Sequence, residues 1–111
     1  MGIDISTALP AVDINTAKEH LRVDFPDDDG LIESLVLSAT QLAEHEIQHA
    51  IITRDGSEGY CTDPAEVPAG IRQWILVHVA HWYEHRQSAS QGALSPVPFV
   101  DSLLDPFRTW S

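Results

Sequence analysis

The chain has 111 residues, a formal net charge of −11 and an apolar fraction of 43%. This length is one domain's worth of chain, and a chain of this mass can bury about two-thirds of its surface in a single core. The apolar fraction is that of a globular protein and excludes a largely disordered chain. The acidic balance disfavours direct DNA or RNA binding, because the protein and the phosphate backbone repel each other.

Membrane insertion and secretion are not expected. No apolar run approaches the ~18 residues of a membrane span, and the first residues have neither the basic region nor the apolar stretch of a signal peptide. The single cysteine, Cys61, has no partner for an internal disulfide, which is typical of a reducing cytosol. An acidic surface of this kind can line a DNA passage without adhering to it, or it can mimic DNA.

The first half of the chain predicts two helices. Asp13 is a suitable N-cap for a short helix over residues 14–22, and Pro26 is expected to end it. The acidic run 27–29 is expected to begin a longer helix, because carboxylates stabilise a helix N-terminus. Apolar residues at 3.6-residue spacing extend that helix to about residue 50.

The second half predicts a turn region and a further long helix. Residues 51–62 suit either a short β-hairpin or a flexible loop, since strand formers flank an Asp-Gly pair. A third helix is expected from Pro68 to about Gln87. A short apolar helix follows over 99–104, and Pro106 ends it.

Together these elements predict one all-α domain over residues 1–111. We expect a small bundle of about four helices, centred on an antiparallel pair of long helices. A flexible N-terminal arm (1–12), a linker (88–98), and a C-terminal helix with an extended tail (99–111) lie at its margins. The residues expected in the core are Leu35, Ala39, Leu42, Ile71, Ile75 and Trp82.

One motif argues for an enzyme. The HEIQH run from His45 to His49 has the HExxH spacing of zinc proteases, in which a helix presents two histidines and a glutamate. At 100° per residue, however, Glu46 falls inside the apolar stripe and the histidines fall on its flank. Glu66 and Glu84 are only loose candidates for the third ligand that such a site needs. We therefore expect no catalytic residue and no metal here, and a polar partner for Glu46; a minimal zinc metalloprotease is the alternative.

Three histidines on the third helix raise a second possibility. His78, His81 and His85 lie along one side at spacings of three and four, together with Glu84. Such a row could bind a metal or respond to pH. His78 lies in the middle of the apolar face beside Trp82, which favours a buried histidine with one hydrogen-bond partner.

The C-terminal segment has apolar and aromatic residues after a helix-breaking proline. Such residues either pack back on their own chain or anchor a partner. We expect a partner or subunit interface here, in which Arg108 pairs with a carboxylate of a neighbour. Its members are Leu103, Leu104, Phe107, Arg108 and Trp110.

Several blocks in this order resemble the head–tail connector (adaptor) family of long-tailed, siphovirus-type bacteriophages. The blocks are AKEHLRVD (17–24), DDD (27–29), LIESL (31–35), VP (67–68), AHWYEHR (80–86) and LLDPFR (103–108). They span nearly the whole chain, and the pairing of the AHWYE–R block with the terminal LL-x-P-aromatic-R is the most specific part. His85 stands where the family pattern has asparagine.

The resemblance implies a structural protein of a phage or prophage, with no enzymatic activity and no cofactor. Its implied partners are copies of itself in a dodecameric ring, the portal protein of the head, and a tail-side connector or stopper protein. DNA would pass through the ring without specific binding, and no membrane is involved. The implied location is the head–tail interface of the virion, after assembly in the bacterial cytoplasm. An acidic DNA-mimic binding protein is a further alternative.

Overall fold

The computed structural model describes residues 5–54 and 56–84, together with Leu104 and Pro106. Three α-helices account for most of this part: α1 (Ile14–Leu21), α2 (Asp29–Ile47) and α3 (Ala69–Glu84). Two 3-10 helices, η1 (Ile5–Thr7) and η2 (Pro64–Glu66), complete it. The predicted small all-α bundle is confirmed, with three α-helices and no strand in the described residues. No helix in this part is long and apolar enough to cross a membrane.

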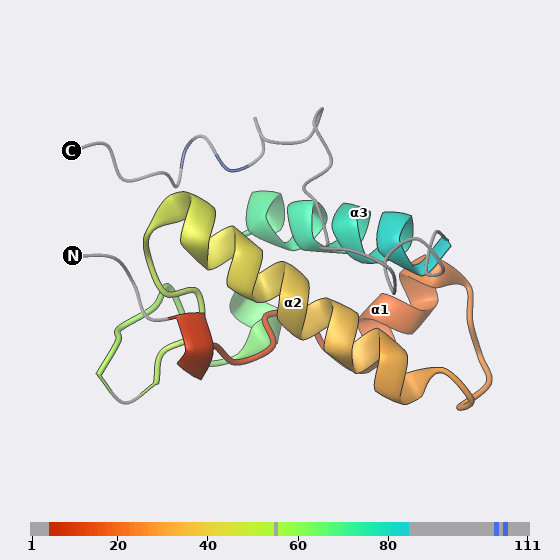
Figure 1. Cartoon of the computed structure of the whole chain (residues 1–111). Helices are drawn as coiled ribbons and strands as arrows, with labels where there is room; N and C mark the ends of the chain where they lie inside the picture. The colour runs from red at the N-terminus through yellow and green to blue at the C-terminus, as the bar shows by residue number, and fades with distance from the viewer. Residues whose placement is uncertain (1–4, 55, 85–103, 105, 107–111) are drawn as a thin grey trace.

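The α2 and α3 helices form the centre of the bundle. They run in opposite directions and pack along most of their length, while α1 lies across one end of the pair (Figure 1). Of the six residues expected in the core, Leu42 is partly buried against the core and five are buried: Leu35, Ala39, Ile71, Ile75 and Trp82. Trp74 on α3 is the largest side chain that is fully buried.

The α1 helix begins as predicted and ends for a different reason. The Asp13 carboxylate accepts a hydrogen bond from the Asn15 amide at 3.1 Å, which caps the helix N-terminus. Arg22 then adopts a left-handed conformation with φ 60°, and the amides of Arg22 and Val23 bond back into the last turn. Pro26 is therefore not the helix stop, because the chain has already left the helix four residues earlier.

The acidic run before α2 makes tertiary contacts instead of a side-chain cap. Asp28 occupies the N-cap position without capping the helix, and its carboxylate accepts a hydrogen bond from the Tyr83 hydroxyl of α3. Asp29 pairs with Lys18 of α1 at 2.8 Å. The start of α2 is thereby tied to both other helices. The helix ends at Ile47, about three residues earlier than predicted, because Gln48 is left-handed with φ 54°.

The N-terminal segment is not a loose arm over residues 5–12. Within it Ala8, Ala11 and Val12 are buried. The main-chain amide of Ala11 donates to the Thr40 hydroxyl of α2 at 3.2 Å, and Gln41 donates to the carbonyl of Ile5 at 3.2 Å. The segment lacks helical periodicity because it packs through small side chains and its own backbone. That contact leaves no repeating apolar pattern in the sequence.

The segment after α2 folds back on itself without forming a β-hairpin ladder. Arg54 and Ser57 exchange two backbone hydrogen bonds of 2.9 Å around a turn in which Gly56 has φ 86°. Beyond that turn the contact between Ile52 and Cys61 is an isolated bridge of parallel type. A Cβ on Gly59 would lie 2.5 Å from the carbonyl oxygen of Ile51, so only glycine allows this close approach of two backbones.

Three predictions lie outside the described residues. These are the end of the third helix near Gln87, the linker over 88–98, and the short helix over 99–104 apart from Leu104 itself.

Candidate functional site

The HExxH residues do not lie together on one helical face. His45 is exposed on the last turns of α2, whereas His49 lies beyond the left-handed Gln48 that ends the helix. His49 is hydrogen-bonded to the carbonyl of Ala50 at 2.6 Å and stacks on Tyr60 with ring centroids 4.6 Å apart. The expectation that the whole motif sits on a helix is therefore wrong. The one-turn spacing that zinc binding uses is lost.

The histidines of α3 are also separated. His78 is fully buried, and its Nδ1–H donates to the carbonyl of Trp74 at 2.8 Å. Its ring stacks on Trp74 at 3.8 Å and meets Trp82 edge-on at 5.5 Å. His81 is exposed, and His85 lies outside the described residues. Among the residues that the structure describes, no three His, Cys, Asp or Glu side chains are grouped to hold a metal ion.

The thiol of Cys61 is a weak nucleophile in this fold. It is half-buried, and burial raises the pKa of Cys61 above its ordinary value. A backbone hydrogen bond at Asp63 lowers the pKa of Cys61 in part, the negative charges of Glu66 and Asp63 raise it again, and Arg72 lowers it slightly.

We expect Cys61 to alkylate more slowly than a free cysteine at pH 8. The raised pKa leaves less thiolate at that pH, and the thiolate is the reactive form. The pH at which half-maximal reactivity is reached should also lie above that of a free thiol. A stopped-time iodoacetamide assay read by mass spectrometry measures both. The urea-unfolded protein is the control and should react at the free-thiol rate. A folded protein that reacts faster than the unfolded one would contradict this assignment.

The buried carboxylate of α2 is Glu44, two residues before the predicted Glu46. Glu44 is 0% exposed, whereas Glu46 is half-buried. On the helical wheel Glu44 lies about 120° from the centre of the predicted apolar stripe. It is buried because residues 5–12 and the segment after α2 cover that flank of the helix, which widens the buried face.

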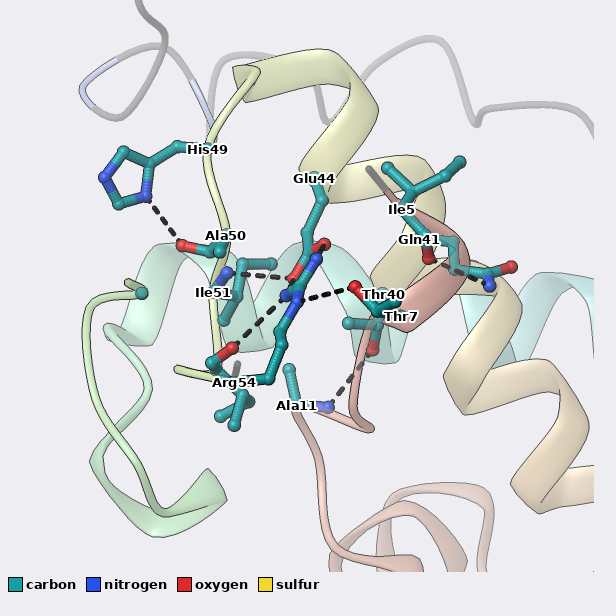
Figure 2. Close-up of polar contacts among 12 residues, drawn as sticks. Ile5, Thr7, Ala11, Thr40, Gln41, Glu44, His49, Ala50, Ile51 and Arg54 are labelled. Carbon is teal, nitrogen blue, oxygen red and sulfur yellow. Dashed lines mark hydrogen bonds and ion pairs between the residues drawn. The ribbon is translucent and has the colours of Figure 1, made fainter. Parts of the chain in front are cut away.

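Glu44 forms a bidentate ion pair with Arg54. The two guanidinium-to-carboxylate distances are 2.6 and 2.7 Å, and the Arg54 side chain is 6% exposed (Figure 2). Glu44 also accepts from the Ile51 amide at 2.9 Å. Arg54 donates further to the carbonyl of Ile52 and to the hydroxyl of Thr7, each at 3.2 Å. A bidentate pair with these added hydrogen bonds has the geometry that offsets the desolvation cost of burying two charges.

The same network reaches the N-terminal segment. Thr40 accepts a hydrogen bond from the Ala11 amide (Figure 2). Its hydroxyl donates to the Val36 carbonyl at 2.8 Å within α2. Three stretches of chain therefore meet at the C-terminal half of α2: residues 5–11, the helix itself, and residues 51–54. The sequence indicates only weakly that these three stretches meet at one polar hub, which consists of Thr40, Glu44 and Arg54. Arg54 is the only lysine or arginine between Arg22 and Arg72, and Thr40 and Glu44 share a helical spacing of four.

An open groove lies beside the N-terminal segment, which lines it with Pro10 and Val12. Two overlapping cavities of about 330 and 420 Å³ share Val12, Asp13 and Pro64. Their apolar lining also includes Ile14 and Val36. Three exposed carboxylates line this acidic groove: Asp13, Glu33 and Asp63. Arg72 lies at one end and donates to the carbonyls of Ala65 and Val67 at 2.9 and 3.2 Å, so its charge is bound to the main chain around η2.

The residues expected at a partner interface are only partly described. Leu104 is 0% exposed and belongs to the core of its own chain. Leu104 packs on its own chain and is not a surface anchor for a partner, because its side chain is already buried within the subunit. The other four members, Leu103, Phe107, Arg108 and Trp110, lie outside the described residues.

The fold and its polar groups define the class of protein. It is a small acidic helical protein whose buried polar side chains hold its own segments together, with an open groove on its surface. A family model for phage gp6-like head-tail connector proteins matches residues 11–106, and the chain belongs to this family. No curated protein and no solved structure matches it. The protein is therefore a structural component of a phage virion at the head–tail junction, where it meets other virion components such as portal and tail. The family is structural and not enzymatic.

Proposed function

We propose that copies of this chain form a ring between the portal of the phage head and a tail-side connector or stopper protein, and that DNA passes through the ring. The observation that carries this proposal is the family match over residues 11–106. A dodecameric ring is the assembly that the family resemblance implies. Assembly would take place in the cytoplasm of the bacterial host, before the tail joins.

The charge of the chain supports the passage of DNA. With −11 on each subunit, the ring would have a negative potential that repels phosphate and keeps DNA from adhering to its lining. Residues 1–53 hold 10 acidic and 2 basic residues, so their own charge is −8. The described helices α1 and α2 both belong to this more acidic half.

The same charge opposes assembly, which gives a prediction for the free protein. We expect monomers at low salt and larger species at high salt or with portal present, because salt screens the repulsion between subunits. Sedimentation velocity at 20 mM and 500 mM salt, over a range of protein concentrations, measures this. A conservative control for surface charge is Glu19→Gln, which should shift the salt dependence only slightly. Association that weakens steadily as salt rises would contradict the proposal.

A further inference from the structure

The acidic groove has the features of a site for an extended apolar segment that carries a positive charge. Its walls are apolar at Val12, Ile14 and Val36. Its carboxylates, Asp13, Glu33 and Asp63, outnumber the single guanidinium of Arg72, which is already bound to main-chain carbonyls. Each cavity is within the size range of ligand pockets in proteins. A matching occupant therefore combines large apolar side chains with a cation.

The chain itself contains such a segment. Phe107 and Trp110 flank Arg108, and Arg108 is the only basic residue after Arg86. Aromatic and arginine side chains are the residue types that most often anchor protein interfaces. Leu104 is fixed in the core of its own chain three residues earlier, so the segment that remains for a partner begins after it.

Two exposed apolar side chains at the corner before α2, Phe25 and Leu31, fit this groove poorly. Phe25 and Leu31 are 45% and 36% exposed, near the acidic run 27–29. Bringing that corner of the molecule to the carboxylates of the groove would place like charges together, which costs free energy. Charge complementarity therefore favours the segment around Arg108, and not this corner, as the occupant of the acidic groove.

We propose that the acidic groove binds the Phe107–Trp110 segment of a second copy of this chain, with Arg108 paired to the carboxylates. The contact joins two different patches of each subunit, so it is heterologous, and repetition of such a contact can close a ring. The inference rests on the proposed function for its place in the virion. Its chemistry depends only on the groove and the segment.

A peptide of residues 106–111, acetylated and amidated, isolates this contact from ring formation. We would titrate it into ¹⁵N-labelled full-length protein at low salt, where the protein is expected to be monomeric. Amide shifts should be confined to residues 12–16 and 33–36 and to Asp63, Ala65 and Arg72. Binding of the peptide should weaken as salt rises, because one attractive charge contact is being screened. This is the opposite of the salt dependence expected for self-association of whole subunits.

A charge exchange gives the sharpest form of the test. Either Glu33→Arg in the protein or Arg108→Glu in the peptide should weaken binding about fivefold, the upper range for one exposed ion pair. Combining the two should restore the affinity to within about twofold. Glu33 is exposed on α2, so its replacement should not disturb folding. Glu19→Arg, an equal charge change at an exposed position of α1 outside the groove, is the matched control and should have little effect.

Absent binding, shifts outside the groove, or an affinity unaffected by the charge exchange would each overturn the proposal. So would a groove filled by the chain's own tail. That case would appear as groove shifts caused by Arg108→Glu in the full chain at concentrations where it is monomeric. None of these results would contradict the connector function, because a ring can close through other surfaces of the subunit. Failure of the connector function itself is measured on phage particles, independently of this peptide.

Discussion

Replacing Arg54 with alanine is expected to lower the free energy of unfolding by about 3–5 kcal/mol, because it leaves the buried Glu44 carboxylate without its counter-ion. The same change removes the hydrogen bond to Thr7 and so loosens the N-terminal segment. Urea unfolding followed by circular dichroism measures the first effect. Hydrogen exchange at the Ala11 amide, which donates to Thr40 nearby, measures the second.

Two controls separate the ion pair from general effects of the substitution. Arg22→Ala removes an exposed arginine and should change stability by no more than about 0.5 kcal/mol. The double variant Glu44→Gln, Arg54→Met removes both charges, and it should be less destabilised than Arg54→Ala since no unpaired charge is left buried. A loss below about 1 kcal/mol for Arg54→Ala would show that the pair is not the hub of this half of the bundle.

Trp82→Ala is the second change with a large expected effect, also about 3–5 kcal/mol, as for other large-to-small substitutions in a core. Trp82 is 4% exposed and meets the buried His78 ring edge-on at 5.5 Å. The change therefore leaves a cavity and removes one wall around that histidine. Chemical denaturation measures the loss, and the near-UV circular dichroism signal of the remaining tryptophans should also decrease.

The matched control for Trp82→Ala is Phe25→Ala. Phe25 is 45% exposed, so its truncation exposes no new cavity and should cost no more than about 0.5 kcal/mol. If the two variants were equally stable, Trp82 would not belong to the core that joins α2 and α3. If Phe25→Ala were the more damaging, the corner before α2 would be a structural contact and not free surface.

The helical part of the fold could be predicted because its signals are local. The 3.6-residue apolar spacing of α2 and α3 predicts both helices and their pairing, and Asp13 predicts the start of α1. The helix ends could not be predicted, because left-handed Arg22 and Gln48 carry no sequence mark such as glycine. The docking of residues 5–12 was equally hidden, since backbone-to-side-chain bonds such as Ala11 to Thr40 have no periodicity.

The polar interior shows the limit of helical-wheel reasoning more clearly. The helical wheel predicts that Glu46 is the buried carboxylate. A helical wheel takes account of the apolar residues of one helix only, and not of segments from elsewhere in the chain that pack on it. Glu44 is buried because two segments distant in sequence cover its flank, and because Arg54 compensates its charge there. The buried state of His78, by contrast, could be predicted, since the residue lies in the middle of the apolar face of α3. For the groove, the residues that line it come from separate parts of the chain (10–16, 33–36, 63–65 and Arg72), so no local pattern indicates it.

The central claim is that this chain joins phage heads to tails, and in vitro complementation tests it most directly. DNA-filled heads of the phage that encodes this protein, assembled without it, would be incubated with purified protein and then with free tails. We expect infectious particles to form only when the protein is added, and electron microscopy to show it as a ring below the portal. Heads that join tails equally well without it, or added protein that never binds the portal vertex, would contradict the account.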